Sequence, residues 1–141
     1  MLRIEQTTLW RHADVGESFF HPRATTLPDG KALMTLQAIS GSDYFGPARA
    51  SFSPDDGETW TKPELIPGLG RIDMGSNVEE GVCDVVPDYH QRTGTVLAIG
   101  HNVFYRGGKL LDTLGDFHSE PERRWFRRPT YTVMDNEGRW N

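Results

Sequence analysis

The candidates for catalysis or ligand binding are three carboxylic acids, two of the five histidines, an arginine, a tyrosine and an asparagine. The candidates are His21, Arg23, Asp43, Tyr44, Glu80, Asp84, His101 and Asn102. A carboxylic acid can protonate a leaving oxygen, and an arginine can hold a carboxylate through two parallel hydrogen bonds. This combination is suited to glycoside chemistry or to sugar binding.

Composition narrows the classes of protein to which the chain can belong. Its 141 residues suggest one domain or a piece of one, and its net charge of −5 argues against a nucleic-acid partner. The single cysteine, Cys83, excludes an internal disulfide and a multi-cysteine zinc site. No apolar run approaches the roughly 20 residues that a membrane span needs, and the start lacks the apolar segment of a secretory signal. We therefore expect a cytoplasmic protein with no membrane contact.

Turn sequences divide the chain into short strands. Leu27-Pro28-Asp29-Gly30 is typical of a turn, because proline presets φ and glycine tolerates a positive φ. The predicted strands are 19–27, 32–39, 47–52, 60–66, 81–86, 95–102 (extending towards 105) and 130–134, with a turn over 88–94 and an insertion loop over 106–128. Both faces of 32–39 are largely apolar, which predicts a strand buried between stacked sheets.

The strands fall into repeated units that end in similar corners. Asp55-Asp56-Gly57-Glu58-Thr59-Trp60 has a counterpart in Asp135-Asn136-Glu137-Gly138-Arg139-Trp140, and the two tryptophans lie 80 residues apart (140 − 60). Four antiparallel strands per repeated unit is the pattern of propeller blades. The predicted fold class is therefore all-β, with about two antiparallel four-stranded blades.

The first corner carries a specific motif. Ser53-x-Asp55-x-Gly57-x-Thr59-Trp60 matches every fixed position of Ser-x-Asp-x-Gly-x-Thr-Trp, and so resembles the Asp-box, or BNR repeat, of sialidase-like six-bladed propellers. A degenerate second copy keeps Asp135, Gly138 and Trp140. The resemblance implies structural turns on the face away from the active site.

The same resemblance implies a domain organisation. Residues 1–141 are expected to be a partial sialidase-like propeller, with blade one at about 19–68 and a truncated blade two at about 79–141. Two blades cannot close a ring of six. We therefore expect an N-terminal fragment, inactive alone, whose ring is completed by the rest of a propeller or by another chain.

The resemblance also implies which residues face a ligand. In such blades the start of the innermost strand and the loop between strands two and three share the ligand face. Asp43 would be the acid that protonates the leaving oxygen, and His21 and Arg23 would orient the substrate. Tyr44, Glu80, Asp84, His101 and Asn102 would contact the carbohydrate, and no cofactor is expected. Phe20-His21-Pro22-Arg23 departs from the family's arginine motif, with Phe20 where the arginine belongs.

Each candidate also has an ordinary structural interpretation. Asp43 could cap a turn, the histidines could bind backbone groups, Arg23 could form a surface ion pair and Glu80 could be solvated. Cys83 could be a small core residue. A metal site of His21, Asp84 and His101 is conceivable, but the spacing does not demand it, so no metal is predicted.

The sequence leaves three interpretations of the protein open. The first is a sialidase-like glycoside hydrolase or carbohydrate-recognising propeller. The alternative is a non-catalytic Asp-box propeller module that binds a glycan or a protein, since fold does not fix function. The third is a truncated product that does not fold alone, whose exposed strand edges would promote aggregation.

Overall fold

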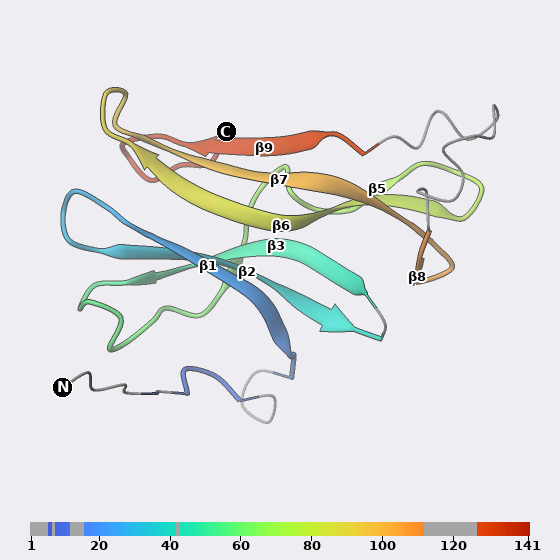
Figure 1. The fold of residues 1–141 in the computed structure, drawn as a ribbon, viewed down its shortest axis with the longest axis horizontal. Coiled ribbons are helices and arrows are strands. Elements are labelled where there is room, and N and C mark those ends of the chain that lie inside the picture. Colours follow the sequence, from blue (N-terminus) through green and yellow to red (C-terminus); the bar gives the residue numbers. More distant parts are fainter. Residues whose placement is uncertain (1–5, 7, 12–15, 42, 112–126) are drawn as a thin grey trace, which may run out of the picture.

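Two antiparallel β-sheets stacked on one another make up the fold (Figure 1). The computed structural model describes residues 6, 8–11, 16–41, 43–111 and 127–141, and this part of the chain contains strands and turns but no helix. The prediction of an all-β protein built from antiparallel sheets is confirmed. No helix among these residues has the length and apolar character that crossing a membrane requires.

The first sheet has the order β1-β2-β3-β4. Its strands are β1 (Phe19–Thr26), β2 (Ala32–Ser40), β3 (Tyr44–Ser53) and β4 (Glu64–Leu65). The β1–β2 turn forms as predicted, with Gly30 at a φ of 85° and Asp29 Oδ1 accepting a hydrogen bond of 3.1 Å from the Lys31 N–H.

The strand predicted over 60–66 is wrong in length, because only Glu64–Leu65 pairs as a strand with β3. Single backbone hydrogen bonds flank it, from the Thr61 N–H to the Phe52 carbonyl and from the Ile66 N–H to the Ala48 carbonyl. Pro63 lies between these contacts and has no N–H to donate. The proline therefore limits regular pairing along this edge.

The second sheet has five strands. They are β5 (Ile72–Asp73), β6 (Val78–His90), β7 (Thr95–Arg106), β8 (Lys109–Leu110) and β9 (Pro129–Met134), in the order β5-β6-β7-β8 with β9 also paired to β7. Both central strands are longer than the sequence predicted. The turn expected over 88–94 is correspondingly shorter, since β6 runs to His90 and pairs there with Thr95.

The insertion loop predicted over 106–128 needs correction at its start. Residues 109–110 form β8, which pairs with the end of β7, and β5 was not predicted. Residues 112–126 of the predicted loop lie outside the described part of the chain. After β9, Trp140 makes an isolated antiparallel bridge back to Met134.

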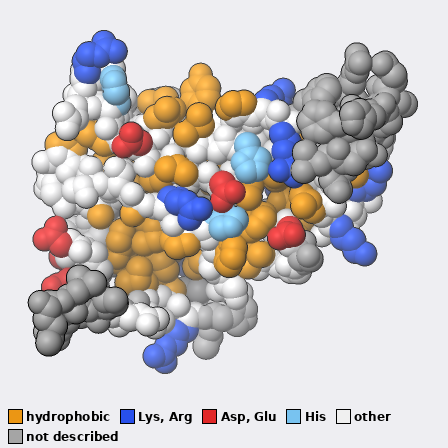
Figure 2. All heavy atoms as spheres, in the orientation of Figure 1, with side chains coloured by type: hydrophobic (Ala, Val, Ile, Leu, Met, Phe, Trp, Pro, Cys, Tyr) orange, Lys and Arg blue, Asp and Glu red, His pale blue; other side chains and the backbone are white. Residues whose placement is uncertain are grey.

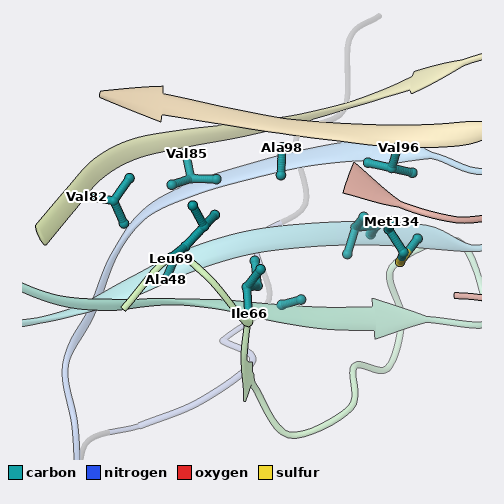
Figure 3. Packing of buried hydrophobic residues seen from close by; sticks show 10 residues of the cluster. Ala48, Ile66, Leu69, Val82, Val85, Val96, Ala98 and Met134 are labelled. Carbon is teal, nitrogen blue, oxygen red and sulfur yellow. The ribbon is translucent and has the colours of Figure 1, made fainter. Parts of the chain in front are cut away.

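The main core lies between the two sheets (Figure 3). Its buried side chains are Leu33, Ala48, Ala50, Ile66, Leu69, Val82, Val85, Val96, Ala98 and Met134. Five consecutive positions of β2, residues 33–37, are buried. This strand is therefore covered on both faces, as its apolar pattern predicted.

Polar side chains of β2 also bind the second sheet directly. The Thr35 hydroxyl donates to the Val85 carbonyl at 2.6 Å, and Gln37 Nε2 donates to the Val82 carbonyl at 2.8 Å. Thr35 and Gln37 are 0% and 1% exposed. Since buried polar groups are costly without partners, these bonds fix how β2 sits against β6.

Candidate functional site

The strand register divides the fold into two ends. One end carries the starts of β1 and β6, the β2–β3 turn and the end of β7. The other end carries the β1–β2 and β6–β7 turns and the two corners at 53–60 and 135–140. Asp43 and Tyr44 lie at the first end, to the right in Figure 1, and the Asp-box residues lie at the second. His21, Arg23, Asp84 and His101 lie along the strands between the two ends.

Three of the candidates meet across the gap between the sheets. Asp84 Oδ1, from β6, lies 3.0 Å from His21 Nδ1 and 3.6 Å from Arg23 Nη2, both on β1. Figure 2 shows histidine, acidic and basic side chains beside one another near the middle of one face, with hydrophobic side chains around them. The structural interpretation of Arg23 as a surface ion-pair residue is therefore confirmed, and its partner, Asp84, is itself a candidate site residue.

The backbone at this contact is unusual. His21 has a φ of 51° and Asp84 a φ of 53°, in the left-handed region that costs a non-glycine residue about 1–3 kcal/mol. Both lie where the register shifts, between Phe20 and Arg23 in β1 and between Cys83 and Val86 in β6. Two irregular strand positions thus face each other and turn their side chains together.

Cys83 and aromatic rings surround the imidazole of His21. Cys83 Sγ lies 3.9 Å from His21 Nδ1, and the His21 ring stacks on Phe45 with centroids 4.9 Å apart. Burial, and after it the Asp84 carboxylate, raises the pKa of the Cys83 thiol to about 11. The prediction that Cys83 is a small core residue is consistent with its 5% exposure, although it also contacts the site.

Asp43 stands apart from these contacts. It lies in the β2–β3 turn with a φ of 54° and an exposed side chain. Within the described residues its carboxylate makes no hydrogen bond or ion pair, so the turn-cap interpretation gains no support. Its charge is near enough to Cys83 to oppose ionisation of the thiol.

Tyr44 belongs to a second group. Its hydroxyl donates to Glu79 Oε2 at 3.0 Å. The Arg71 guanidinium lies 4.5 Å from the Tyr44 ring centroid and 3.9 Å from that of Tyr105, and it also donates to the Phe45 carbonyl. Sequence reasoning missed Arg71, because nothing local marks it. Only the lack of a side chain at Gly81, where a Cβ would meet Arg71, leaves room for it.

Glu80 belongs to a third group, at the side of the second sheet. Its carboxylate accepts hydrogen bonds from Asn102 Nδ2 at 2.8 Å and from Arg128 Nη2 at 3.0 Å, and the Arg128 N–H donates to Asn102 Oδ1. Glu80 is 6% exposed, so the interpretation as a solvated acid is wrong. Arg128 was missed as a partner because it lies in the segment expected to be a loop.

His101 pairs in register with Cys83 across β6 and β7 and is half-buried. Burial, and then the positive charge of Arg127, hold the pKa of His101 below its ordinary value, while Asp84 acts in the opposite direction. Among the described contacts, none joins His101 to His21. The histidine pair considered from the sequence is therefore not a direct one.

The opposite end shows how the motif at 53–60 works. Asp55 Oδ1 accepts the Thr59 N–H at 2.8 Å, and Asp55 Oδ2 accepts the Thr59 hydroxyl at 2.6 Å. The Ser53 hydroxyl binds Asp55 and accepts the Gly57 N–H, and the Trp60 indole donates to the Gly57 carbonyl. Every fixed polar side chain of the motif is thus used within the turn.

The degenerate corner repeats part of this arrangement. Asp135 Oδ1 accepts the Arg139 N–H at 2.9 Å, four residues along, as Asp55 does for Thr59. The Arg139 guanidinium takes the place of the threonine hydroxyl, with Nε 2.9 Å from Asp135 Oδ2. A hollow of about 590 Å³ lies between the two sheets at this end, lined by Leu27, Phe52, Tyr89 and Met134 among others.

Comparison with known proteins adds no family to these observations. No protein-family model matches the chain, and no curated protein matches it.

Proposed function

We propose that the surface carrying His21, Arg23 and Asp84 is part of the carbohydrate-binding surface of a sialidase-like glycoside hydrolase, with Asp43 as the proton donor. One observation carries the proposal. His21 and Arg23 converge on Asp84 from the other sheet, and the β2–β3 turn presents the exposed carboxylate of Asp43, whose charge acts on the neighbouring Cys83.

The side chains on this surface suit a sugar. A guanidinium has five N–H donors, and the contacts of Arg23 with Asp84 and the Pro22 carbonyl engage Nη2 and Nη1, which leaves donors for a substrate carboxylate or hydroxyl. Phe20 is 48% exposed and lies beside the His21 ring. Its ring offers an apolar surface to the C–H face of a sugar.

The general acid must be free to reach the leaving oxygen. Asp43 is the candidate carboxylate that is not held by a hydrogen bond in the described part of the chain, whereas Glu80 and Asp84 are both paired. In hydrolysis the Asp43 carboxylic acid would protonate the leaving oxygen, and His21 and Arg23 would fix the substrate beside it.

We propose the propeller architecture on the same footing. The two sheets pack face to face over a shared core, and both tryptophan-ended corners lie at one end. The outer face of the second sheet exposes Val86, Leu97, Ile99 and Tyr131, a surface on which a further sheet could pack. The remaining blades would come from the same protein or from another chain.

The test is hydrolysis of fluorogenic glycosides, sialosides included, by the full-length protein. Asp43→Asn should lower turnover by about a hundredfold or more, the low end for general acid catalysis. Asp56→Asn is the matched control, since Asp56 is also exposed and has a φ of 55°, but lies at the opposite end. An unchanged rate in the Asp43 variant removes this residue from the mechanism.

A second candidate function is binding without turnover. Asp84 is paired with Arg23, and Glu80 is paired with Arg128 in its separate group, so two of the three candidate carboxylates are neutralised. This favours recognition over chemistry. Retention of a glycan on an array, with no hydrolysis by the same preparation, would support this module in place of the enzyme.

A further inference from the structure

We infer that His21, Cys83 and Asp84 together form a binding site for a borderline-soft divalent cation, with Zn²⁺ as the best match. Each residue offers one ligand atom, and the imidazole nitrogen, the thiol sulfur and the carboxylate oxygen all lie within 4.8 Å of one another. The inference goes beyond the proposed function, because it holds whether or not the surface binds a sugar.

The separations between the ligand atoms fit a tetrahedral ion. Zinc bonds of about 2.0–2.1 Å to nitrogen and oxygen and about 2.3 Å to sulfur place neighbouring ligand atoms about 3.3–3.6 Å apart. The nitrogen–oxygen separation here is 3.0 Å and the nitrogen–sulfur separation is 3.9 Å. Zinc binding would therefore widen the nitrogen–oxygen separation and shorten the nitrogen–sulfur separation, each by about 0.3–0.4 Å. The sulfur–oxygen separation is at most 4.8 Å.

The donor set selects the kind of ion. A thiolate with an imidazole favours Zn²⁺ over Mg²⁺ or Ca²⁺, which prefer oxygen ligands. Three protein ligands leave the fourth position of a tetrahedron for water or a substrate oxygen. The side chains of His21 and Asp84 are 23% and 43% exposed, so this position would face solvent. Binding would displace the thiol proton of Cys83 to the buffer.

The surroundings of the cluster hold its ligands and set its charge. Phe20 and Phe45 pack against the His21 ring and restrict its rotation. Arg23 contacts the same Asp84 oxygen as His21 does, and it would have to share this carboxylate with the ion.

Charges on neighbouring elements also act on the cluster. The negative charge of Asp43, in the β2–β3 turn, raises the pKa of the Cys83 thiol. The positive charge of Arg127 lowers the pKa of both Cys83 and His101. With Asp84 and Arg23 included, two carboxylates and two guanidiniums lie around the cluster, so their charges balance. The Cys83 thiolate would therefore give the cluster one net negative charge.

A metal site at these three ligands would account for the strained backbone of His21 and Asp84. His21 and Asp84 both adopt a positive φ, and regular strands at these points would direct neighbouring side chains to opposite faces. The register shifts bring Cys83 and Asp84, which are adjacent in sequence, to the same imidazole. A metal site needs such convergence from two strands.

The experiment measures metal binding by the full chain, prepared without a histidine tag and stripped with a chelator. Titration with Co²⁺ should give one equivalent bound and a thiolate-to-cobalt absorption band in the near ultraviolet, and Zn²⁺ should displace it. Competition with a chromophoric chelator then gives the Zn²⁺ affinity of each variant.

Three ligand variants and one control decide the outcome. Cys83→Ser should abolish the band. His21→Asn and Asp84→Asn, which suit a positive φ, should weaken Zn²⁺ binding by about a hundredfold or more, since even outer-shell changes cost about 10–100-fold. His90→Asn is the control, because His90 is an exposed histidine at the other end of β6 and should leave affinity unchanged.

Two results would overturn the inference. One is a folded wild-type chain that shows no cobalt band. The other is undiminished Zn²⁺ affinity in the folded His21 and Asp84 variants, which decide the matter if the serine variant at buried Cys83 does not fold. Sugar binding by the metal-free protein would leave the proposed function intact, so the two proposals fail separately.

Discussion

His21 Nδ1 and Asp84 Oδ1 lie 3.0 Å apart although the residues belong to different sheets, and both residues have a φ near 50°, at 51° and 53°. Each lies at a shift in the register of its strand. Strained backbone persists only where the surrounding structure over-determines it, and such positions cluster at functional sites. The contact therefore links the candidate site to the way in which the sheets are held together.

Thr35→Val tests the polar contact that holds β2 against β6. The Thr35 hydroxyl donates 2.6 Å to the Val85 carbonyl, directly beside the strained Asp84. Loss of this buried hydrogen bond should lower the free energy of unfolding by about 1–3 kcal/mol, as measured by urea denaturation. Thr25→Val is the control, since Thr25 makes no side-chain hydrogen bond in the described residues. Equal effects of the two variants would mean that the contact contributes nothing.

Gly100→Ala tests the close approach of β7 to the irregular part of β6. A Cβ at Gly100 would lie 2.5 Å from the Cys83 carbonyl oxygen and 3.1 Å from a Val85 methyl group, so backbone must shift. We expect a loss of about 1–3 kcal/mol in stability, as for overpacking. Gly70→Ala is the control, because a Cβ there meets nothing within 4 Å. An unchanged melting temperature for Gly100→Ala would contradict the packing described.

The hydrogen bonds of Asp55 should make the free energy of unfolding depend on pH in the acid range. Hydrogen bonds from Thr59, its hydroxyl first and then its backbone N–H, lower the pKa of Asp55 in the folded state. A lowered folded pKa means a stabilising contribution that is full above the unfolded value of about 3.9 and is lost as the pH falls through the folded value. Thermal unfolding between these values should therefore depend less on pH in Asp55→Asn than in wild type. A wild-type slope in Asp55→Asn would exclude this source.

The pKa of His101 should respond in opposite directions to the removal of its two charged neighbours, Arg127 and Asp84. Burial and Arg127 lower the pKa of His101, and Asp84 raises it. An NMR titration of the imidazole should give a value below the ordinary 6.5. Arg127→Ala should move this value upward and Asp84→Asn should move it further down, since each change removes one of these charges. Shifts of the same sign in both variants would show that the two charges do not lie where the fold places them.

The spacing of residues along the chain predicted the features that are completed within a few residues. The β1–β2 turn and the Asp55 corner form as their sequences indicate, because donor and acceptor lie two to four positions apart. The apolar pattern of β2 likewise predicted burial on both faces. The antiparallel all-β fold follows from such local signals, since turns and alternation are written into neighbouring residues.

The site itself depends on contacts that no local pattern encodes. Cys83 and His21 are 62 positions apart, and they meet only because two sheets stack with irregular registers that face each other. Arg71 and Arg128 find Tyr44 and Glu80 in the same way, across distances that spacing does not reveal. A one-residue change of register turns a side chain to the other face of a sheet. Neighbouring residues thus encode the strands and corners, whereas the stacking and register of the two sheets bring the chemical groups of the site together.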